Sequence, residues 1–95
     1  MADTPDRVLT EPLSIYPNPG DGNYFIALTG EPGVIDVIVR NQLGQEVKTM
    51  TGLKAEGNRY ALDVRELPQG IYTVEIRTAR GKAMKKVIKY QESQR

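Results

Sequence analysis

Apolar and polar residues alternate in short runs from residue 13 to residue 90, and turn-forming residues separate the runs. A period of two is typical of strands buried on one face, because successive side chains point to opposite sides of a sheet. The clearest run is VIDVIVRN at 34–41, which places Ile35, Val37 and Val39 on one face. No window repeats its apolar residues at helical spacing. The pattern therefore predicts an all-β fold.

Seven short strands are expected from these runs. Their approximate ranges are 13–16, 24–29, 34–41, 46–50, 59–64, 71–77 and 82–90. Besides the third strand, the side chains expected to face the core are Tyr24, Ile26, Leu28, Tyr60, Leu62, Val64, Tyr72, Val74 and Ile76. Turn signals about every ten residues favour an antiparallel, immunoglobulin-like β-sandwich. The Cys–Trp–Cys signature of antibody domains is missing, so the prediction concerns architecture alone.

The turns between these strands follow known residue preferences. NQLG at 41–44 has Asn at its start and Gly at its end, which predicts a turn closed by a left-handed Gly44. GEPG at 30–33 and LPQG at 67–70 are also expected to form turns. LPQG lacks the Thr of the Gram-positive sortase signal, and no apolar span with a basic tail follows it. The turn is therefore the better interpretation.

The stretch YPNPGDG at 16–22 is expected to end the first strand and to form a stiff turn. Pro17 and Pro19 donate no main-chain hydrogen bond, so ladder pairing cannot continue through them. The glycines permit positive φ, and the Asn18 side chain can bond to nearby main chain. Physical chemistry alone leaves two interpretations open. The stretch is either a plain strand exit or a surface that a partner recognises.

The last expected strand, 82–90, has an irregular pattern. Met84, Ile88 and Tyr90 share a face with Lys86, whereas Val87 lies on the opposite face among lysines. A β-bulge within the strand, or a position at the edge of a sheet, would explain the pattern.

Charge is divided unevenly along the chain, although the net charge is only +1. Residues 1–50 hold seven acids and three bases, and residues 51–95 hold ten bases and five acids. Six of these bases lie between Arg77 and Lys89. Lysines on an edge strand can prevent sheet-to-sheet aggregation, and they can also dock an acidic partner. Nucleic-acid binding is not expected, because Tyr90 is the one aromatic residue there that could stack on bases.

The composition argues against a catalytic or metal site. The chain has no Cys and no His, which removes thiolate chemistry, the commonest metal ligand and the usual general base. The carboxylates Asp21, Glu31 and Asp63 stand in or beside turns and form no cluster in the sequence. No catalytic, cofactor-binding or metal-binding residue is therefore predicted.

The length of 95 residues suits one domain at 13–90 between two polar tails. Residues 1–12 have neither a basic start nor an apolar core, so we expect a linker or an artificial tail rather than a signal peptide. Residues 91–95 are expected to be a polar tail. No apolar run is long enough to predict a transmembrane segment.

Four sequence segments, taken together in their order along the chain, indicate a protein family more specifically than any one of them does. IYPNPGDGNY is followed by VIVRNQLGQEV, then by LDVRELPQGIYTVEI, and finally by GKAMKKVIKY. This order resembles the type A C-terminal sorting domain of the type IX secretion system of Bacteroidetes. The resemblance extends from about Leu13 to Tyr90.

The resemblance marks a set of sorting-motif residues. They are Tyr16, Pro17, Asn18, Pro19 and Gly22 in the first motif, Gly44 and Val47 in the second, Leu67, Pro68, Gly70 and Tyr72 in the third, and Gly81, Lys85, Lys86 and Lys89 in the last. The tail QESQR after Tyr90 is slightly longer than the usual ending of the family.

The resemblance implies a non-catalytic secretion signal without a cofactor. The expected partners are the outer-membrane translocon and shuttle proteins of the type IX system, and a surface sortase-like peptidase. A parent cargo would cross the periplasm and reach the cell surface or the medium. The peptidase would cut within or upstream of residues 1–12 and attach the cargo to lipopolysaccharide. The alternative function is an accessory β-sandwich module that binds carbohydrate or protein.

Overall fold

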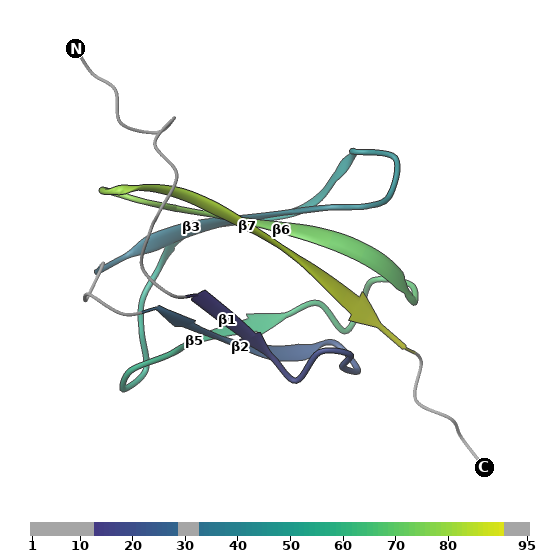
Figure 1. The fold of residues 1–95 in the computed structure, drawn as a ribbon, viewed down its shortest axis with the longest axis horizontal. Helices are drawn as coiled ribbons and strands as arrows, with labels where there is room; N and C mark the ends of the chain where they lie inside the picture. Colours follow the sequence, from purple (N-terminus) through teal and green to yellow (C-terminus); the bar gives the residue numbers. More distant parts are fainter. Residues whose placement is uncertain (1–12, 29–32, 91–95) are drawn as a thin grey trace.

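A computed structural model describes residues 13–28 and 33–90, and these residues form two antiparallel sheets packed face to face (Figure 1). The strands are β1 (Leu13–Tyr16), β2 (Asn23–Leu28), β3 (Ile35–Arg40), β4 (Glu46–Leu53), β5 (Tyr60–Asp63), β6 (Gly70–Thr78) and β7 (Gly81–Lys89). One sheet has the order β1-β2-β5 and the other has the order β4-β3-β6-β7. The predicted antiparallel β-sandwich is confirmed.

The strand ranges differ from the expected ones by a few residues. β4 continues to Leu53, three residues beyond its expected end, and its pairing with β3 is irregular at two places. The tails 1–12 and 91–95 lie outside the described residues, as do the expected end of the second strand and most of the turn at 30–33. In the part of the chain that is described, no helix is long and apolar enough to cross a membrane.

The core fills the space between the inner faces of the two sheets. Its buried side chains are Ile15, Tyr24, Ile26, Ile35, Val37, Val39, Tyr60, Leu62, Val64, Tyr72, Val74, Ile76 and Val87. All the side chains expected to face inward are among these, except Leu28, which is half-buried and packs against them. Period-two alternation therefore identified the inner faces correctly.

Three buried tyrosines carry their hydroxyl groups to main-chain acceptors at the rim of the core. The Tyr24 hydroxyl donates to the Ile88 carbonyl at 2.8 Å, the Tyr60 hydroxyl to that of Gly33, and the Tyr72 hydroxyl to that of Pro68. Burial raises the pKa of each of these phenols. Each ring thus contributes apolar area to the core, and its polar end remains satisfied.

β7 lies at the edge of the four-stranded sheet, which explains its irregular pattern. Its register with β6 continues without a break from one end of the strand to the other, so the edge interpretation is correct and the bulge is not. Val87 faces the core at 1% exposure, whereas Met84 and Ile88 lie on the outer face at 54% and 43%. The sheet therefore presents apolar side chains to solvent along its last strand.

Candidate functional site

The four segments that carry the expected motifs come together at one end of the sandwich, on the right in Figure 1. At this end β1 leads into residues 17–22, β3 turns into β4, β6 begins and β7 ends. Gly81 is the exception, because it begins β7 at the other end of the sandwich. There it pairs with Thr78 beside the turn between β6 and β7. We call the end where the four segments meet the motif end.

Residues 18–20 pair with the edge of β7, although nearly 70 residues separate them in the chain. The Asn18 side-chain nitrogen Nδ2 donates to the Lys86 carbonyl at 3.0 Å, and the Asn18 side-chain oxygen accepts from the Ile88 main-chain amide at 2.9 Å. The Gly20 amide donates to the Ile88 carbonyl at 3.0 Å, and the Tyr90 amide donates to the Gly20 carbonyl at 2.9 Å. Together these bonds cover the last part of the β7 edge. The Asn18 side chain makes the hydrogen bonds that the main chain of a neighbouring strand would otherwise make.

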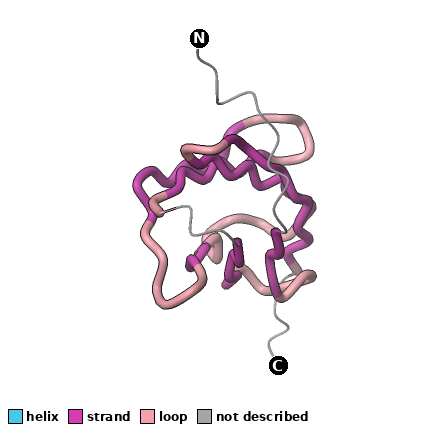
Figure 2. Tube along the Cα trace, turned by 60° about the vertical axis from the view of Figure 1, so that its left-hand side comes forward, coloured by secondary structure: helices cyan, strands magenta, loops and turns pink. Residues whose placement is uncertain are grey.

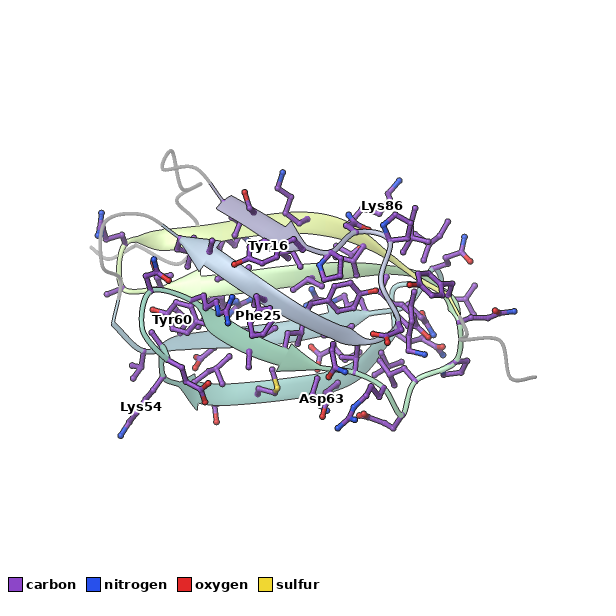
Figure 3. The ribbon with its side chains drawn as sticks, turned by 90° about the horizontal axis from the view of Figure 1, so that it is seen from below. Tyr16, Phe25, Lys54, Tyr60, Asp63 and Lys86 are labelled. Atoms are coloured by element: carbon purple, nitrogen blue, oxygen red, sulfur yellow. The ribbon has the colours of Figure 1, made fainter. Side chains whose placement is uncertain are left out.

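Tyr16 and the two prolines, Pro17 and Pro19, are exposed. The bonds Tyr16–Pro17 and Asn18–Pro19 are both cis peptides. Tyr16 lies beside Phe25 on the outer face of the three-stranded sheet, with their ring centroids 6.0 Å apart (Figure 3). The guanidinium of Arg59 lies 3.9 Å from the centre of the Phe25 ring, so a cation covers this ring.

The glycines of the first motif are required by close approach of other groups. At Gly20, an added Cβ would lie 2.8 Å from the Pro17 carbonyl oxygen. At Gly22, φ is +116°, and a Cβ would lie 2.8 Å from the Arg65 Cα and 2.9 Å from the Lys89 Cε. The family motif marked Gly22 but not Gly20. The sequence signal for Gly20 was its place directly after Pro19, which does not by itself reveal a close contact.

The third motif forms the corner between β5 and β6. Leu67 packs against the core, and its amide donates to the Val64 carbonyl at 3.0 Å. Pro68 supplies the carbonyl that accepts from the Tyr72 hydroxyl. Gly70 begins β6 and faces Lys89 at the end of β7. This motif therefore holds the start of β6 against the strand that carries the last motif.

The second motif forms the β3–β4 hairpin. The Asn41 side-chain oxygen accepts from the amides of Leu43 and Gln45, and the Gly44 amide donates to the Asn41 carbonyl at 3.0 Å. The expected left-handed Gly44 is confirmed by its φ of +83°. A shallow depression of about 200 Å³ separates this hairpin from the start of β6. Val47 is exposed at the irregular start of β4.

The three lysines of the last motif have different environments. Lys86 lies on the outer face of the sheet, where it is opposite Thr73. Lys85 falls on the same side of β7 as the buried Val87 but is itself exposed. Lys89 is 7% exposed, and its Cε lies close to Gly22. These lysines therefore do not form one continuous basic patch.

A buried carboxylate on the outer face of β6 was not predicted. Glu75 is 2% exposed, and its two oxygens accept from Arg40 Nη1 and Arg77 Nε at 2.6 Å each. Burial alone would raise the pKa of Glu75, but the bonds from the two arginines outweigh burial and lower this pKa. A glutamate on a strand normally indicates a solvent-facing position, so burial of Glu75 could not be predicted from the sequence.

The described carboxylates do not assemble into a metal site: no group of three or more acidic ligands exists among them. Asp63 is paired with Arg65, whose hydrogen bonds lower the pKa of Asp63 to about 2. Asp21 accepts from the Asn23 amide at 3.3 Å. Glu31 lies outside the described residues.

Residues 14–90 match the family model of the secretion system C-terminal sorting domain. The match includes all four motif segments and most of the chain. The chain belongs to this family. A comparison with individually curated proteins found no match. As a sorting domain, the chain is a type IX secretion signal that directs export to the cell surface or the medium through the secretion machinery. Domains of this family are in general non-catalytic.

Replacing Asn18 with alanine is expected to loosen the end of β7 in the sorting domain. Both side-chain bonds to β7 would be lost, so the free energy of unfolding should fall by about 1–2 kcal/mol. Urea unfolding measures this change, and the Ile88 amide should exchange with deuterium faster. Asn58→Ala is the matched control, because this exposed asparagine makes no side-chain hydrogen bond with the described residues. Equal effects of the two substitutions would contradict the prediction.

Proposed function

We propose that the motif end is the surface by which the type IX machinery recognises this sorting domain. One observation supports this proposal above the others. Hydrogen bonds join the first motif to the last strand, so segments from both ends of the domain form one folded unit. A surface of this kind loses little conformational entropy when a partner docks on it.

The marked residues then divide into two roles. The first group fixes the shape of the motif end, and the second group is exposed there and meets the partner. The first group comprises Asn18, Gly22, Gly44, Leu67, Gly70, Tyr72 and Lys89. The second comprises Tyr16, Pro17, Pro19, Val47, Pro68, Lys85 and Lys86. Gly81 serves the turn at the opposite end and lies outside this surface.

The finer steps of export follow from the same proposal. The parent protein passes through the periplasm, where shuttle proteins and the outer-membrane translocon engage the folded domain. A surface sortase-like peptidase then cuts within or upstream of residues 1–12, and the cargo is attached to lipopolysaccharide. The domain itself supplies a docking surface and no reacting group.

Export of a fusion protein tests the proposal. Residues 1–95 are joined to the carboxyl end of a reporter that carries its own signal for crossing the inner membrane. We expect the reporter outside the cell in a type IX-competent host and not in a strain that lacks the translocon. Retention of the reporter in both hosts would contradict the proposed function.

Two bulky substitutions in the same fusion test the position of the surface. Gln69 is exposed at the motif end, and Ala79 is exposed in the turn at the opposite end. Gln69→Trp should reduce export several-fold, whereas Ala79→Trp should leave export unchanged. The reverse result would place recognition at the other end of the sandwich.

A further inference from the structure

The outer face of the four-stranded sheet is hollowed beneath the β3–β4 hairpin. This hollow has a volume of about 680 Å³. It is bounded by parts of β3, β6 and β7 and by the hairpin turn. Figure 2 shows the loop of this hairpin standing above the sheet. The hollow faces away from the core and extends from the motif end along the sheet.

Four cationic side chains line this hollow, and they outnumber its single carboxylate. The cations are Arg40, Arg77, Lys82 and Lys86. The carboxylate, Glu75, has both oxygens bonded to the two arginines and is buried beneath them. Neither lysine forms an ion pair with any described residue. The hollow therefore carries an excess of positive charge.

Apolar side chains alternate with these cations along the edge strand. On the outer face of β7, Lys82, Met84, Lys86 and Ile88 follow one another at every second residue. Ile71 of β6 lies opposite Ile88 and also lines the hollow. An extended chain matches this spacing if acidic and apolar side chains alternate along one of its faces, that is, at every second residue, because the side chains on one face of a strand repeat at that distance.

We propose that this hollow binds an acidic, extended segment of a partner protein in the secretion machinery. This inference rests on the proposed function and names the chemistry of one partner. A lipid surface fits less well, because the hairpin turn lines the hollow and its loop stands above the sheet (Figure 2), so a flat membrane would meet the loop before the sheet. Thr73 and Gln42 supply uncharged groups that can pair with the main chain of the segment.

A peptide-binding measurement on the 95-residue chain tests this inference. The probe is a fluorescein-labelled peptide that repeats Glu-Ser-Val-Ser (the Glu–Val peptide), so that Glu and Val alternate along one face of the extended chain. Its fluorescence anisotropy reports binding. We expect binding that weakens as salt rises, because exposed charges are screened. The double variant Lys82→Glu/Lys86→Glu should weaken binding about tenfold or more, since two attractive charges become repulsive.

Lys54→Glu is the matched control, because Lys54 is exposed, lies outside the hollow and belongs to none of the sorting motifs. Circular dichroism confirms that each variant folds. An equal loss of binding in the control would overturn the inference, and so would equal binding of a peptide in which Lys replaces each Glu of the Glu–Val peptide. Tighter binding to vesicles with anionic headgroups than to the Glu–Val peptide would overturn it as well.

The reporter fusion separates this inference from the proposed function. If the fusion with the native domain is exported and the Lys82→Glu/Lys86→Glu fusion is exported equally well, the inference fails and the proposed function stands. If the variant reduces both export and peptide binding, and Lys54→Glu reduces neither, the inference is supported. If the native fusion is retained, the proposed function fails, and partnership with the secretion machinery fails with it.

Discussion

Replacing Gly22 with alanine is expected to lower the free energy of unfolding by about 3–5 kcal/mol. The φ of +116° is strained for any residue with a side chain. In addition, the new methyl group would lie 2.8 Å from the Arg65 Cα, which is main chain and cannot simply rotate away. The Gly22 carbonyl also accepts from the Val64 amide at 2.8 Å, so movement of the turn would break a bond to the end of β5.

This loss is large, because the whole free energy of unfolding of a typical small domain is roughly 5–15 kcal/mol. Urea unfolding measures it, and the reporter fusion carrying the substitution should be exported poorly because the motif end would be distorted. Gly57→Ala is the matched control. Gly57 also has a positive φ, +70°, but an added Cβ would meet nothing within 4 Å. The Gly57→Ala substitution should lower the free energy of unfolding by about 1–2 kcal/mol, from backbone strain alone. Similar costs for both variants would show that close contact with Arg65 does not matter.

The strands and their inner faces could be predicted because they depend on local pattern. The alternation of Ile35, Val37 and Val39 needs no knowledge of the rest of the chain, since a strand has a fixed period. The left-handed Gly44 was predictable for the same reason, because its turn involves only neighbouring residues. An edge position of β7 was one of two interpretations that the sequence left open, beside a bulge, and lysines are typical of strands at the edge of a sheet.

The contacts that create the motif end could not be predicted from local pattern. Asn18 bonds to the main chain of Lys86 and Ile88, and main-chain groups carry no sequence signal. The sequence alone indicated that the first strand ends at Tyr16 and that the chain turns at 16–22, which is correct but incomplete. The resemblance to the family identified which segments matter, whereas their pairing depends on how the two sheets stack.

The outer face of the four-stranded sheet shows a second feature that could not be predicted from local sequence pattern. Glu75 and Arg77 alternate as solvent-facing residues of an ordinary strand should. Burial of Glu75 depends on Arg40, which belongs to β3 and lies 35 residues away in the chain. The excess of bases between Arg77 and Lys89 did indicate a charged surface. It did not reveal that the two arginines cover one carboxylate, or that Lys85 and Lys89 lie on the other side of β7.

Removal of residues 87–95 is expected to abolish both cooperative unfolding and export. Val87 is fully buried, and its loss alone would remove about 2 kcal/mol of apolar burial. The Tyr24 hydroxyl would lose its acceptor on Ile88 and stay buried without a partner, at a cost of about 1–3 kcal/mol. Asn18 and Gly20 would lose every hydrogen bond that joins them to β7, except the bond from Asn18 to Lys86.

Together these losses approach the whole stability of a domain of this size, because they occur at one connected place in the fold. Circular dichroism during urea titration should therefore show a gradual change in place of a sharp transition, and the truncated reporter fusion should be retained in the cell. Removal of residues 91–95 alone is the control, because it leaves each of these contacts in place. A chain ending at Lys86 that still unfolds sharply and is exported at the full level would show that the pairing of residues 18–20 with β7 is not what the secretion machinery requires.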